Sequence, residues 1–277
     1  MGDVKLWVLD LGRMHIDRSL LVANWRTATV HDPHPRGELA EFPVSAYYID
    51  HPDGKILYDT GCHPQAMGPD GRWPQDFQDQ YPWHGGEECH LPNRLEQLGI
   101  GPNDIRYVVL SHLHADHAGC IEFFRKSRII VHEDEFAAAL KSYATREEQT
   151  SYTWKDTDQW IRQGHDWRLV GRDEGDLELA DNVEILNFGA GHSYGMLGLH
   201  LRLAEAGGII FTSDAIYSST NYGPPMRPQG FAYDSLGYAR TVERIRALAA
   251  KTKSQVWFGH DTEQFASLRP STQGHYA

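Results

Sequence analysis

Four residues of metal-binding type lie within six consecutive positions of this 277-residue chain, directly after a short apolar run. They are His112, His114, Asp116 and His117, and the run before them, Tyr107–Leu110, is typical of a buried strand. Imidazole and carboxylate groups are ligands that zinc and related divalent metals take in proteins. His112 and His114 can point the same way from an extended segment, whereas the adjacent Asp116 and His117 must diverge. The cluster therefore predicts a metal-dependent hydrolase and suits two metal ions better than one.

Three further residues of these types each follow a predicted apolar strand. His192 comes after Val183–Leu186, Asp214 after Gly208–Phe211, and His260 after Gln255–Phe258. If these strand ends lie at the same edge of a sheet sandwich as the end of the first strand, all four segments deliver their side chains to one place. The shared placement predicts a single centre with seven ligand residues.

The remaining apolar runs indicate the elements that would hold such a centre. One group of strands is predicted at Leu6–Leu9, Val44–Ile49, Lys55–Tyr58, Tyr107–Leu110 and Arg128–Val131, and a second at Val183–Leu186, Leu197–Leu203, Gly208–Phe211 and Gln255–Phe258. Helices are predicted at Leu91–Leu98, Gly119–Arg125, Glu133–Tyr143, Trp154–Gln163 and Ser235–Ala250. Two groups of strands, each followed by helices, indicate an α/β protein with two sheets packed face to face and helices outside.

The length of the chain fits one domain, residues 1–277, with a sizeable core. Two irregular stretches, near residues 62–90 and 219–231, interrupt the pattern and are interpreted as loop insertions. Loops of this length are often functional, and both carry aromatic side chains suited to a substrate pocket. The predicted substrate contacts are Tyr194, Met196, Tyr222 and Phe231.

Charge and cysteine content limit the class of protein further. The chain has 26 Lys and Arg against 38 Asp and Glu, and the formal net charge of −12 argues against a protein that binds nucleic-acid phosphates. No apolar run is long enough to span a membrane, and the first residues do not resemble a signal peptide. Cys62, Cys89 and Cys120 form no CxxC pair. We therefore expect a cytoplasmic protein with neither a nucleic-acid nor a membrane partner.

The order of these motifs resembles the metallo-β-lactamase superfamily. The matching motifs are His112-x-His114-x-Asp116-His117, Gly191-His192, Asp214, Gly259-His260 and the early turn Asp59-Thr60-Gly61. Within that superfamily the chain is most similar to the N-acyl-homoserine lactonases, on the segments Gly12-Arg13-Met14, Asp214-Ala215-Ile216-Tyr217 and Phe258-Gly259-His260-Asp261. The resemblance implies an αββα sandwich of two mixed β-sheets with outer helices.

The same resemblance implies a centre of two zinc ions, or of other divalent transition metals. His112, His114 and His192 would bind the first metal, Asp116, His117 and His260 the second, and Asp214 would bridge both together with a hydroxide. Attack of that hydroxide would open the ring of an N-acyl-homoserine lactone or a related lactone. Tyr217 would hydrogen-bond the carbonyl oxygen, and Asp116 would protonate the leaving alkoxide as general acid. We expect a small lactone as the partner and a monomer or homodimer as the assembly.

Other substrates and one other mechanism stay open at this point. The lactonases commonly have a second histidine where this chain has Met196, and Tyr194 is bulky, so an aromatic lactone, a γ-lactam or a thioester is an alternative substrate. Separately, Gly191-His192-Ser193-Tyr194-Gly195 matches the G-x-S-x-G nucleophile elbow of serine hydrolases, with Ser193 as nucleophile. The elbow requires a helix after the serine, whereas the residues that follow alternate as a strand does, which disfavours this hypothesis.

Overall fold

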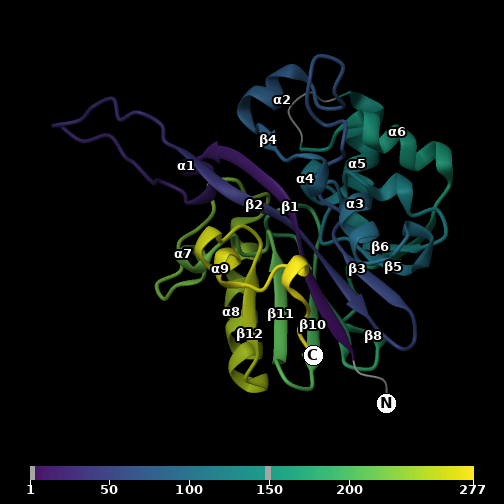
Figure 1. The fold of residues 1–277 in the computed structure, drawn as a ribbon. Helices are drawn as coiled ribbons and strands as arrows, with labels where there is room; N and C mark the ends of the chain where they lie inside the picture. The colour runs from purple at the N-terminus through teal and green to yellow at the C-terminus, as the bar shows by residue number, and fades with distance from the viewer. Residues whose placement is uncertain (1–3, 147–150) are drawn as a thin grey trace.

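The strands of the chain form two β-sheets packed face to face, in a computed structural model that describes residues 4–146 and 151–277. Helices cover the outer face of each sheet (Figure 1). Each sheet contains both antiparallel and parallel strand pairs. The chain thus adopts an αββα sandwich of two mixed sheets, and the predicted fold class is confirmed.

The larger sheet has seven strands in the order β4-β1-β2-β3-β5-β6-β7. Their bounds are β1 Lys5–Asp17, β2 Leu39–Asp50, β3 Lys55–Tyr58, β4 Trp83–His84, β5 Ile105–Val109, β6 Arg128–His132 and β7 Asp166–Val170. The strands from β3 through β5 and β6 to β7 run parallel to one another. The carboxyl ends of β3 and β5 therefore meet at one edge of the sandwich.

The smaller sheet has five strands in the order β12-β11-β10-β9-β8. Their bounds are β8 Leu177–Ala180, β9 Val183–Gly189, β10 Met196–Leu203, β11 Gly207–Ser213 and β12 Gln255–Phe258. The strands β8 to β11 form an antiparallel meander, and β12 joins β11 in parallel. The carboxyl ends of β9, β11 and β12 consequently lie at the same edge of this sheet.

The helices are mostly short, and the longest one covers the smaller sheet. Their bounds are α1 Arg18–Leu21, α2 Gln75–Gln80, α3 Leu91–Gln97, α4 Ala115–Ala118, α5 Glu133–Thr145, α6 Trp154–Gln163, α7 Ser219–Tyr222, α8 Ser235–Thr252 and α9 Thr262–Ser267. In α8, Tyr238, Val242 and Ile245 recur at helical spacing and pack on Leu186 and Ile210 of the smaller sheet. Within residues 4–146 and 151–277, no helix combines the length and the apolar character needed to cross a membrane.

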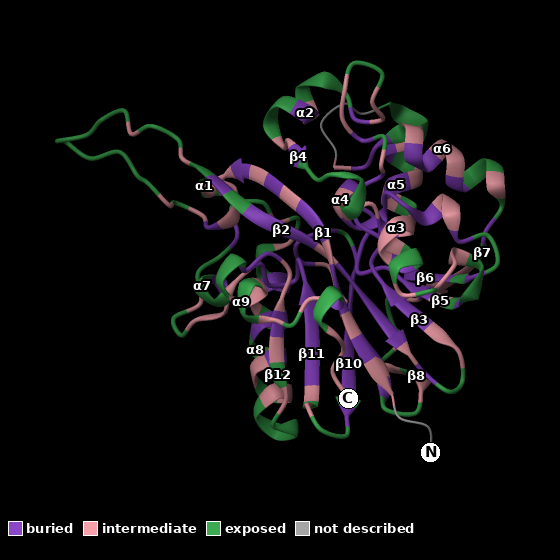
Figure 2. Cartoon of the chain, in the orientation of Figure 1, coloured by how far each residue is buried: buried purple, intermediate pink, exposed green. Residues whose placement is uncertain are grey.

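Side chains that alternate along the strands fill the space between the two sheets. In β1, Leu6 and Val8 belong to this inner cluster together with Leu197 and Leu199 of β10, whereas Leu9 packs on the opposite face. This alternation follows from the two-residue period of a strand. The buried residues of both sheets form a continuous layer (Figure 2). The edge that carries the strand ends is therefore held by a well-packed double sheet.

The structure corrects several predicted elements. The first strand does not end at Leu9, because β1 continues to Asp17 and pairs with β2 over most of that length. The helix predicted at Gly119–Arg125 is wrong, since a 3-10 turn at Ile121–Phe123 stands there. Strands β7 and β8 were not predicted, because their short segments are only partly buried. The stretch near residues 62–90 contains α2 and β4.

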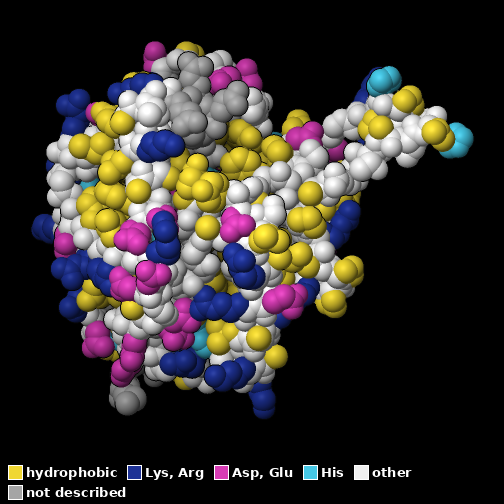
Figure 3. Space-filling model, turned by 180° about the vertical axis from the view of Figure 1, so that it is seen from behind, with side chains coloured by type: hydrophobic (Ala, Val, Ile, Leu, Met, Phe, Trp, Pro, Cys, Tyr) yellow, Lys and Arg dark blue, Asp and Glu magenta, His cyan; other side chains and the backbone are white. Residues whose placement is uncertain are grey.

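Residues 22–38, between α1 and β2, form an arm that projects from the body of the molecule (Figure 1, Figure 3). Most of the arm is exposed, and Val30 within it is 92% exposed. At the base, the backbone N–H of Ala23 donates to the carbonyl oxygen of Pro228 at 2.9 Å. The arm follows directly on α1, whose Leu21 lines the cavity described below.

Candidate metal centre

The structure brings together all seven residues that the sequence predicts as metal ligands. They form two adjacent groups, and within each group the candidate ligand atoms all lie within 4.8 Å of one another. The first group is His112, His114, His192 and Asp214, and the second is Asp116, His117 and His260. All except Asp116 are buried, with at most 7% exposure, so the centre is shielded from bulk water on most sides.

The loop after β5 supplies four of the seven residues. His112 lies in the loop itself, and His114, which has extended backbone, is the N-cap residue of the short helix α4. That helix carries Asp116 and His117 within one turn. Two backbone hydrogen bonds fix the turn to the loop after β3: the Thr60 N–H donates to the His117 carbonyl at 2.6 Å, and the Gly119 N–H donates to Gly61 at 2.9 Å.

The smaller sheet supplies the other three residues. His192 lies in the turn between β9 and β10, Asp214 directly follows β11, and His260 follows β12 by two residues. Gly259 permits the close approach of these two strand ends, because a Cβ there would lie 2.9 Å from Oδ1 of Asp214 and 2.6 Å from the Ser213 backbone. Each of the two ligand groups thus takes side chains from both sheets.

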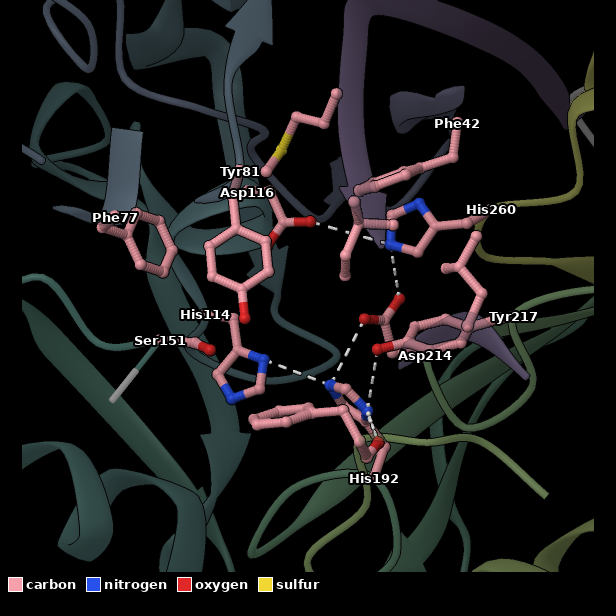
Figure 4. Close-up of a pocket in the computed structure, with 14 residues that line it drawn as sticks. Phe42, Phe77, Tyr81, His114, Asp116, Ser151, His192, Asp214, Tyr217 and His260 are labelled. Carbon is pink, nitrogen blue, oxygen red and sulfur yellow. Dashed lines mark hydrogen bonds and ion pairs between the residues drawn. The ribbon is translucent and has the colours of Figure 1, made fainter. Parts of the chain in front are cut away.

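Asp214 lies between the two groups, with one oxygen facing each of them (Figure 4). Its Oδ1 is 2.9 Å from Nε2 of His260 and 3.3 Å from Nε2 of His117. Its Oδ2 is 3.3 Å from Nε2 of His192 and 3.7 Å from Nε2 of His112. A carboxylate in this position can bridge two cations, one held by each histidine pair.

Four of the histidines are oriented by a contact at Nδ1, which leaves Nε2 directed at the centre. The Nδ1 contacts are Ser111 Oγ at 3.0 Å for His112, Asp59 Oδ2 at 3.0 Å for His117, the Phe231 carbonyl at 3.3 Å for His192 and the Pro43 carbonyl at 2.9 Å for His260. A carbonyl or carboxylate oxygen only accepts, and the Ser111 hydroxyl donates its own proton to Asp59 Oδ2, so in all four histidines Nδ1 carries the proton and the lone pair is on Nε2. This is the tautomer that a metal bound at Nε2 requires.

The chemistry of the buried atoms fits a metal. Nε2 of His112, Nε2 of His117 and Oδ1 of Asp214 are buried and have no hydrogen-bond partner among the described residues. Buried polar atoms normally have a partner, so three such atoms within the two ligand groups fit the binding of cations. Burial, reinforced by the imidazole of His192, lowers the pKa of His114 to about 3, which keeps it in the neutral form that binds metals.

At His117 the balance of effects is different. Burial lowers its pKa, but the carboxylates of Asp214, Asp116 and Asp59 outweigh burial and raise it. In the absence of a cation, this imidazole therefore holds a proton between the carboxylates. A metal ion that binds here takes the place of that proton.

Glu135, in the first turn of α5, joins the two loops that carry the first ligand group, and it was not identified from the sequence. Its Oε1 accepts hydrogen bonds from the Leu113 N–H and the Tyr152 hydroxyl, both at 2.9 Å. Its Oε2 accepts from the Ser193 hydroxyl at 2.6 Å and the Gly195 N–H at 3.2 Å. The available signal was its position on α5, since residues 135, 139 and 142 form the buried face of that helix.

The contacts of Ser193 argue against the serine-hydrolase alternative. Ser193 lies in a turn between two antiparallel strands, so the strand–turn–helix geometry of a nucleophile elbow is absent from this described segment. Its hydroxyl donates to Glu135 and lies 3.1 Å from the Tyr152 hydroxyl. Asp214 and His260, which follow Ser193 in the Ser…Asp…His chain order of such hydrolases, lie in the metal centre. Ser193 is a buried structural serine.

The metal centre opens into a cavity with about 460 Å³ of empty space, part of which is open to solvent. Its polar lining residues are His114, Asp116, Ser151, His192, Asp214, Tyr217 and His260, and its other lining residues, called the apolar wall below, are Met14, Ile16, Leu21, Phe42, Phe77, Tyr81 and Phe231. Tyr217 and Phe231 were expected at the site. Phe77 and Tyr81 were not expected there. The stretch near residues 62–90 has no periodicity that would show which of its aromatic side chains face inward.

Three predicted substrate contacts lie outside the lining of this cavity. Tyr194 stacks on Tyr233 at the surface, with ring centroids 3.9 Å apart. Met196 is the first residue of β10 and is 1% exposed, because it packs beneath the turn that carries His192. Tyr222 packs against Phe258 with ring centroids 5.4 Å apart. None of these three is among the described residues that border the cavity.

Comparisons with known proteins agree with this geometry. The sequence model of the metallo-β-lactamase superfamily matches residues 39–260. The chain is 52% identical over 276 residues to the N-acyl homoserine lactonase AiiB of Agrobacterium fabrum, and 30% identical over 266 residues to AiiA of Bacillus thuringiensis subsp. kurstaki. The alignments cover 100% of both chains in the first case and 96% of both in the second.

Solved structures of the same kind superimpose on the whole chain. One is an N-acyl homoserine lactone hydrolase with the product N-hexanoyl-L-homoserine at its catalytic metal centre, with a TM-score of 0.82, 28% identity and 100% coverage of both chains. Another is a quorum-quenching N-acyl homoserine lactone hydrolase, with a TM-score of 0.80, 28% identity, and coverage of 100% of this chain and 99% of that one.

Proposed function

The chain belongs to the metallo-β-lactamase superfamily, and from this we propose that it is a metal-dependent hydrolase that opens the lactone ring of N-acyl-homoserine lactones. The observation that carries the proposal is the lining of the cavity, which combines a buried His/Asp centre with an apolar wall. The polar lactone would lie at the centre and the acyl chain along the wall. The 52% identity to a named lactonase over the full length supports this substrate. Such an activity would serve quorum quenching.

We propose two zinc ions as the cofactors, with other divalent transition metals as substitutes. His112, His114 and His192 would hold one ion and Asp116, His117 and His260 the other, with Asp214 shared. An all-nitrogen and oxygen set of neutral histidines and carboxylates is typical of catalytic zinc. Bound at this place, the ions would supply a water that is ionised near neutral pH and would polarise the carbonyl.

Tyr217 is placed to hydrogen-bond the carbonyl oxygen of the substrate. Its hydroxyl lies 3.3 Å from Nδ1 of His192, and its ring lines the cavity. Because Nδ1 carries a proton in the tautomer described above, it offers no lone pair to the tyrosine, and the hydroxyl proton stays available to the substrate. Burial raises the pKa of Tyr217 well above its ordinary value, so the hydroxyl remains a donor at neutral pH.

Asp116 is placed to act as general acid for the leaving oxygen. Its Oδ2 faces Nε2 of His117 at 3.4 Å and Nε2 of His260 at 3.6 Å. The residue also borders the cavity, and its side chain is 15% exposed. A carboxylate here can take up the proton that the attacking water gives up and pass it to the alkoxide that forms when the ring opens.

The three thiols fit the cytoplasm, which we propose as the location. Cys62, Cys89 and Cys120 are all free, and two of them are buried. Free thiols are usual in a reducing compartment.

A substrate panel tests the proposed function. Purified protein, analysed for zinc, would be assayed with homoserine lactones of several acyl lengths, an aromatic lactone, a γ-lactam and a thioester. We expect kcat/KM to be highest for an acyl-homoserine lactone, and to rise with acyl length while the chain still contacts the apolar wall. Faster turnover of the lactam or the thioester, or an active sample free of metal, would overturn the proposal.

Replacing Tyr217 with phenylalanine should lower kcat by about a hundredfold, which is the usual cost of removing one donor to a developing oxyanion. Metal content, measured on the same sample, should not change, because the hydroxyl is not a ligand. Tyr222→Phe is the matched control, since its ring lies outside the cavity, and it should retain full activity. An unchanged kcat in Tyr217→Phe would remove this residue from the mechanism.

A further inference from the structure

Tyr81 presents a hydroxyl group to the substrate cavity from a firmly held position. It directly follows α2, and its backbone N–H donates to the Phe77 carbonyl at 2.8 Å. The Tyr81 ring packs on the Phe77 ring, with centroids 4.8 Å apart. The helix is fixed in turn by Gln78, a buried side chain that donates to the carbonyl oxygens of Trp73 and Gly68 and accepts from the Gly68 N–H. The segment is therefore a rigid support.

The hydroxyl of Tyr81 makes no hydrogen bond to another residue within the described part of the chain, where the contacts of Tyr81 involve its ring and its backbone. Figure 4 shows the ring entering the cavity with its oxygen directed inward, on the side opposite Tyr217. Burial, together with the Asp116 carboxylate, raises the pKa of Tyr81, so the group is a donor at neutral pH. A half-buried donor without a protein partner is available to a ligand.

The chemistry of an acyl-homoserine lactone suggests which ligand atom this donor meets. The amide group is attached to the ring carbon next to the lactone carbonyl, so it lies between the ring and the acyl chain. Tyr81 likewise connects the apolar wall with the metal centre. Its ring packs on Phe77 of that wall, and its side chain borders the same cavity as Asp116 and His114. Tyr217 has another role, because its hydroxyl already contacts His192.

We infer that the Tyr81 hydroxyl donates a hydrogen bond to the amide carbonyl oxygen of the substrate and so selects α-amido lactones over lactones without an amide. This inference rests on the proposed function and assigns the specificity of the enzyme for the substrate amide to one residue. The contact does not involve the atoms that change during hydrolysis, so it stabilises the bound substrate and the transition state alike. Its loss should raise KM and leave kcat nearly unchanged.

The test compares Tyr81→Phe with the wild type on two lactones of equal length. One is N-hexanoyl-homoserine lactone, and the other is an α-alkyl-γ-butyrolactone in which methylene groups replace the amide. For the amide substrate we expect KM to rise about threefold to tenfold, as for the loss of one neutral hydrogen bond. For the amide-free lactone we expect no loss, so the wild-type preference for the amide should shrink by the same factor.

Two controls separate this role from others. Ile16→Val removes one methyl group from the apolar wall and leaves the Tyr81 hydroxyl in place, so it should affect both lactones equally. The melting temperature and metal content of Tyr81→Phe should match the wild type, since only one oxygen atom is removed. An equal loss on both substrates, or no loss on either, would overturn the inference. If the wild type opens neither lactone, the proposed function itself is overturned.

Discussion

Replacing Asp214 with asparagine is expected to lower kcat/KM for lactone hydrolysis by about a thousandfold or more, with at least half of the bound metal lost. The reason is the position of its two oxygens, one 2.9 Å from His260 and the other 3.3 Å from His192. Asparagine keeps the shape but removes the negative charge and one of the two ligand oxygens. One cation would then lose its ligand oxygen, and the repulsion between the two cations would no longer be reduced by a shared anion.

Elemental analysis and steady-state kinetics on the same sample measure this effect. Asp173→Asn is the matched control, because that aspartate is exposed, and it should leave both quantities unchanged. Chelation of the wild type should reproduce the loss of activity, and added zinc should restore it in the wild type alone. Full activity and full metal content in Asp214→Asn would contradict a bridging role.

Replacing Glu135 with alanine should destabilise the protein by about 3–5 kcal/mol, which is a large effect for one residue. The carboxylate is fully buried and accepts four hydrogen bonds, from Leu113, Tyr152, Ser193 and Gly195. Alanine would leave these donors unpaired, and each buried unpaired donor costs about 1–3 kcal/mol, although the costs do not add fully. Metal affinity should fall as well, since the loops that carry His114 and His192 would lose their common anchor.

Denaturant unfolding of the zinc-loaded protein measures the first effect, and zinc titration measures the second. Glu133→Ala in the same helical turn is exposed and should change the free energy of unfolding by less than about 1 kcal/mol. Glu135→Gln keeps an acceptor oxygen, so its free energy of unfolding should lie between those of Glu135→Ala and Glu133→Ala. A stability of Glu135→Ala equal to that of Glu133→Ala would contradict the anchoring role.

The fold and the positions of the ligand residues were predictable from the sequence because both depend on local patterns. Apolar runs such as Tyr107–Leu110 are recognisable as strands without knowledge of their neighbours. The histidines and aspartates follow those runs directly. Once parallel strands share an edge, their ends must meet, and the structure brings His112, His192, Asp214 and His260 together there.

The apolar wall of the cavity was less predictable, because it depends on which way each side chain faces in irregular backbone. Tyr194 and Tyr81 are both aromatic residues in turns, yet one stacks at the surface and the other enters the cavity. No periodicity distinguishes them. Glu135 was missed for a related reason: an acidic residue at a helix start usually faces solvent, and here its four partners come from segments distant in sequence.

Both ligand groups take side chains from the two sheets, since His112 through His117 follow β5 and the other three residues follow strands of the smaller sheet. A bound cation is therefore a removable cross-link between the layers of the sandwich. Its binding free energy is also folding free energy, because the unfolded chain does not present the ligands together. Each tenfold rise in free metal above the dissociation constant adds about 1.4 kcal/mol per ion to resistance against unfolding. The concentration of free metal should thus affect the stability of the folded enzyme as well as its activity.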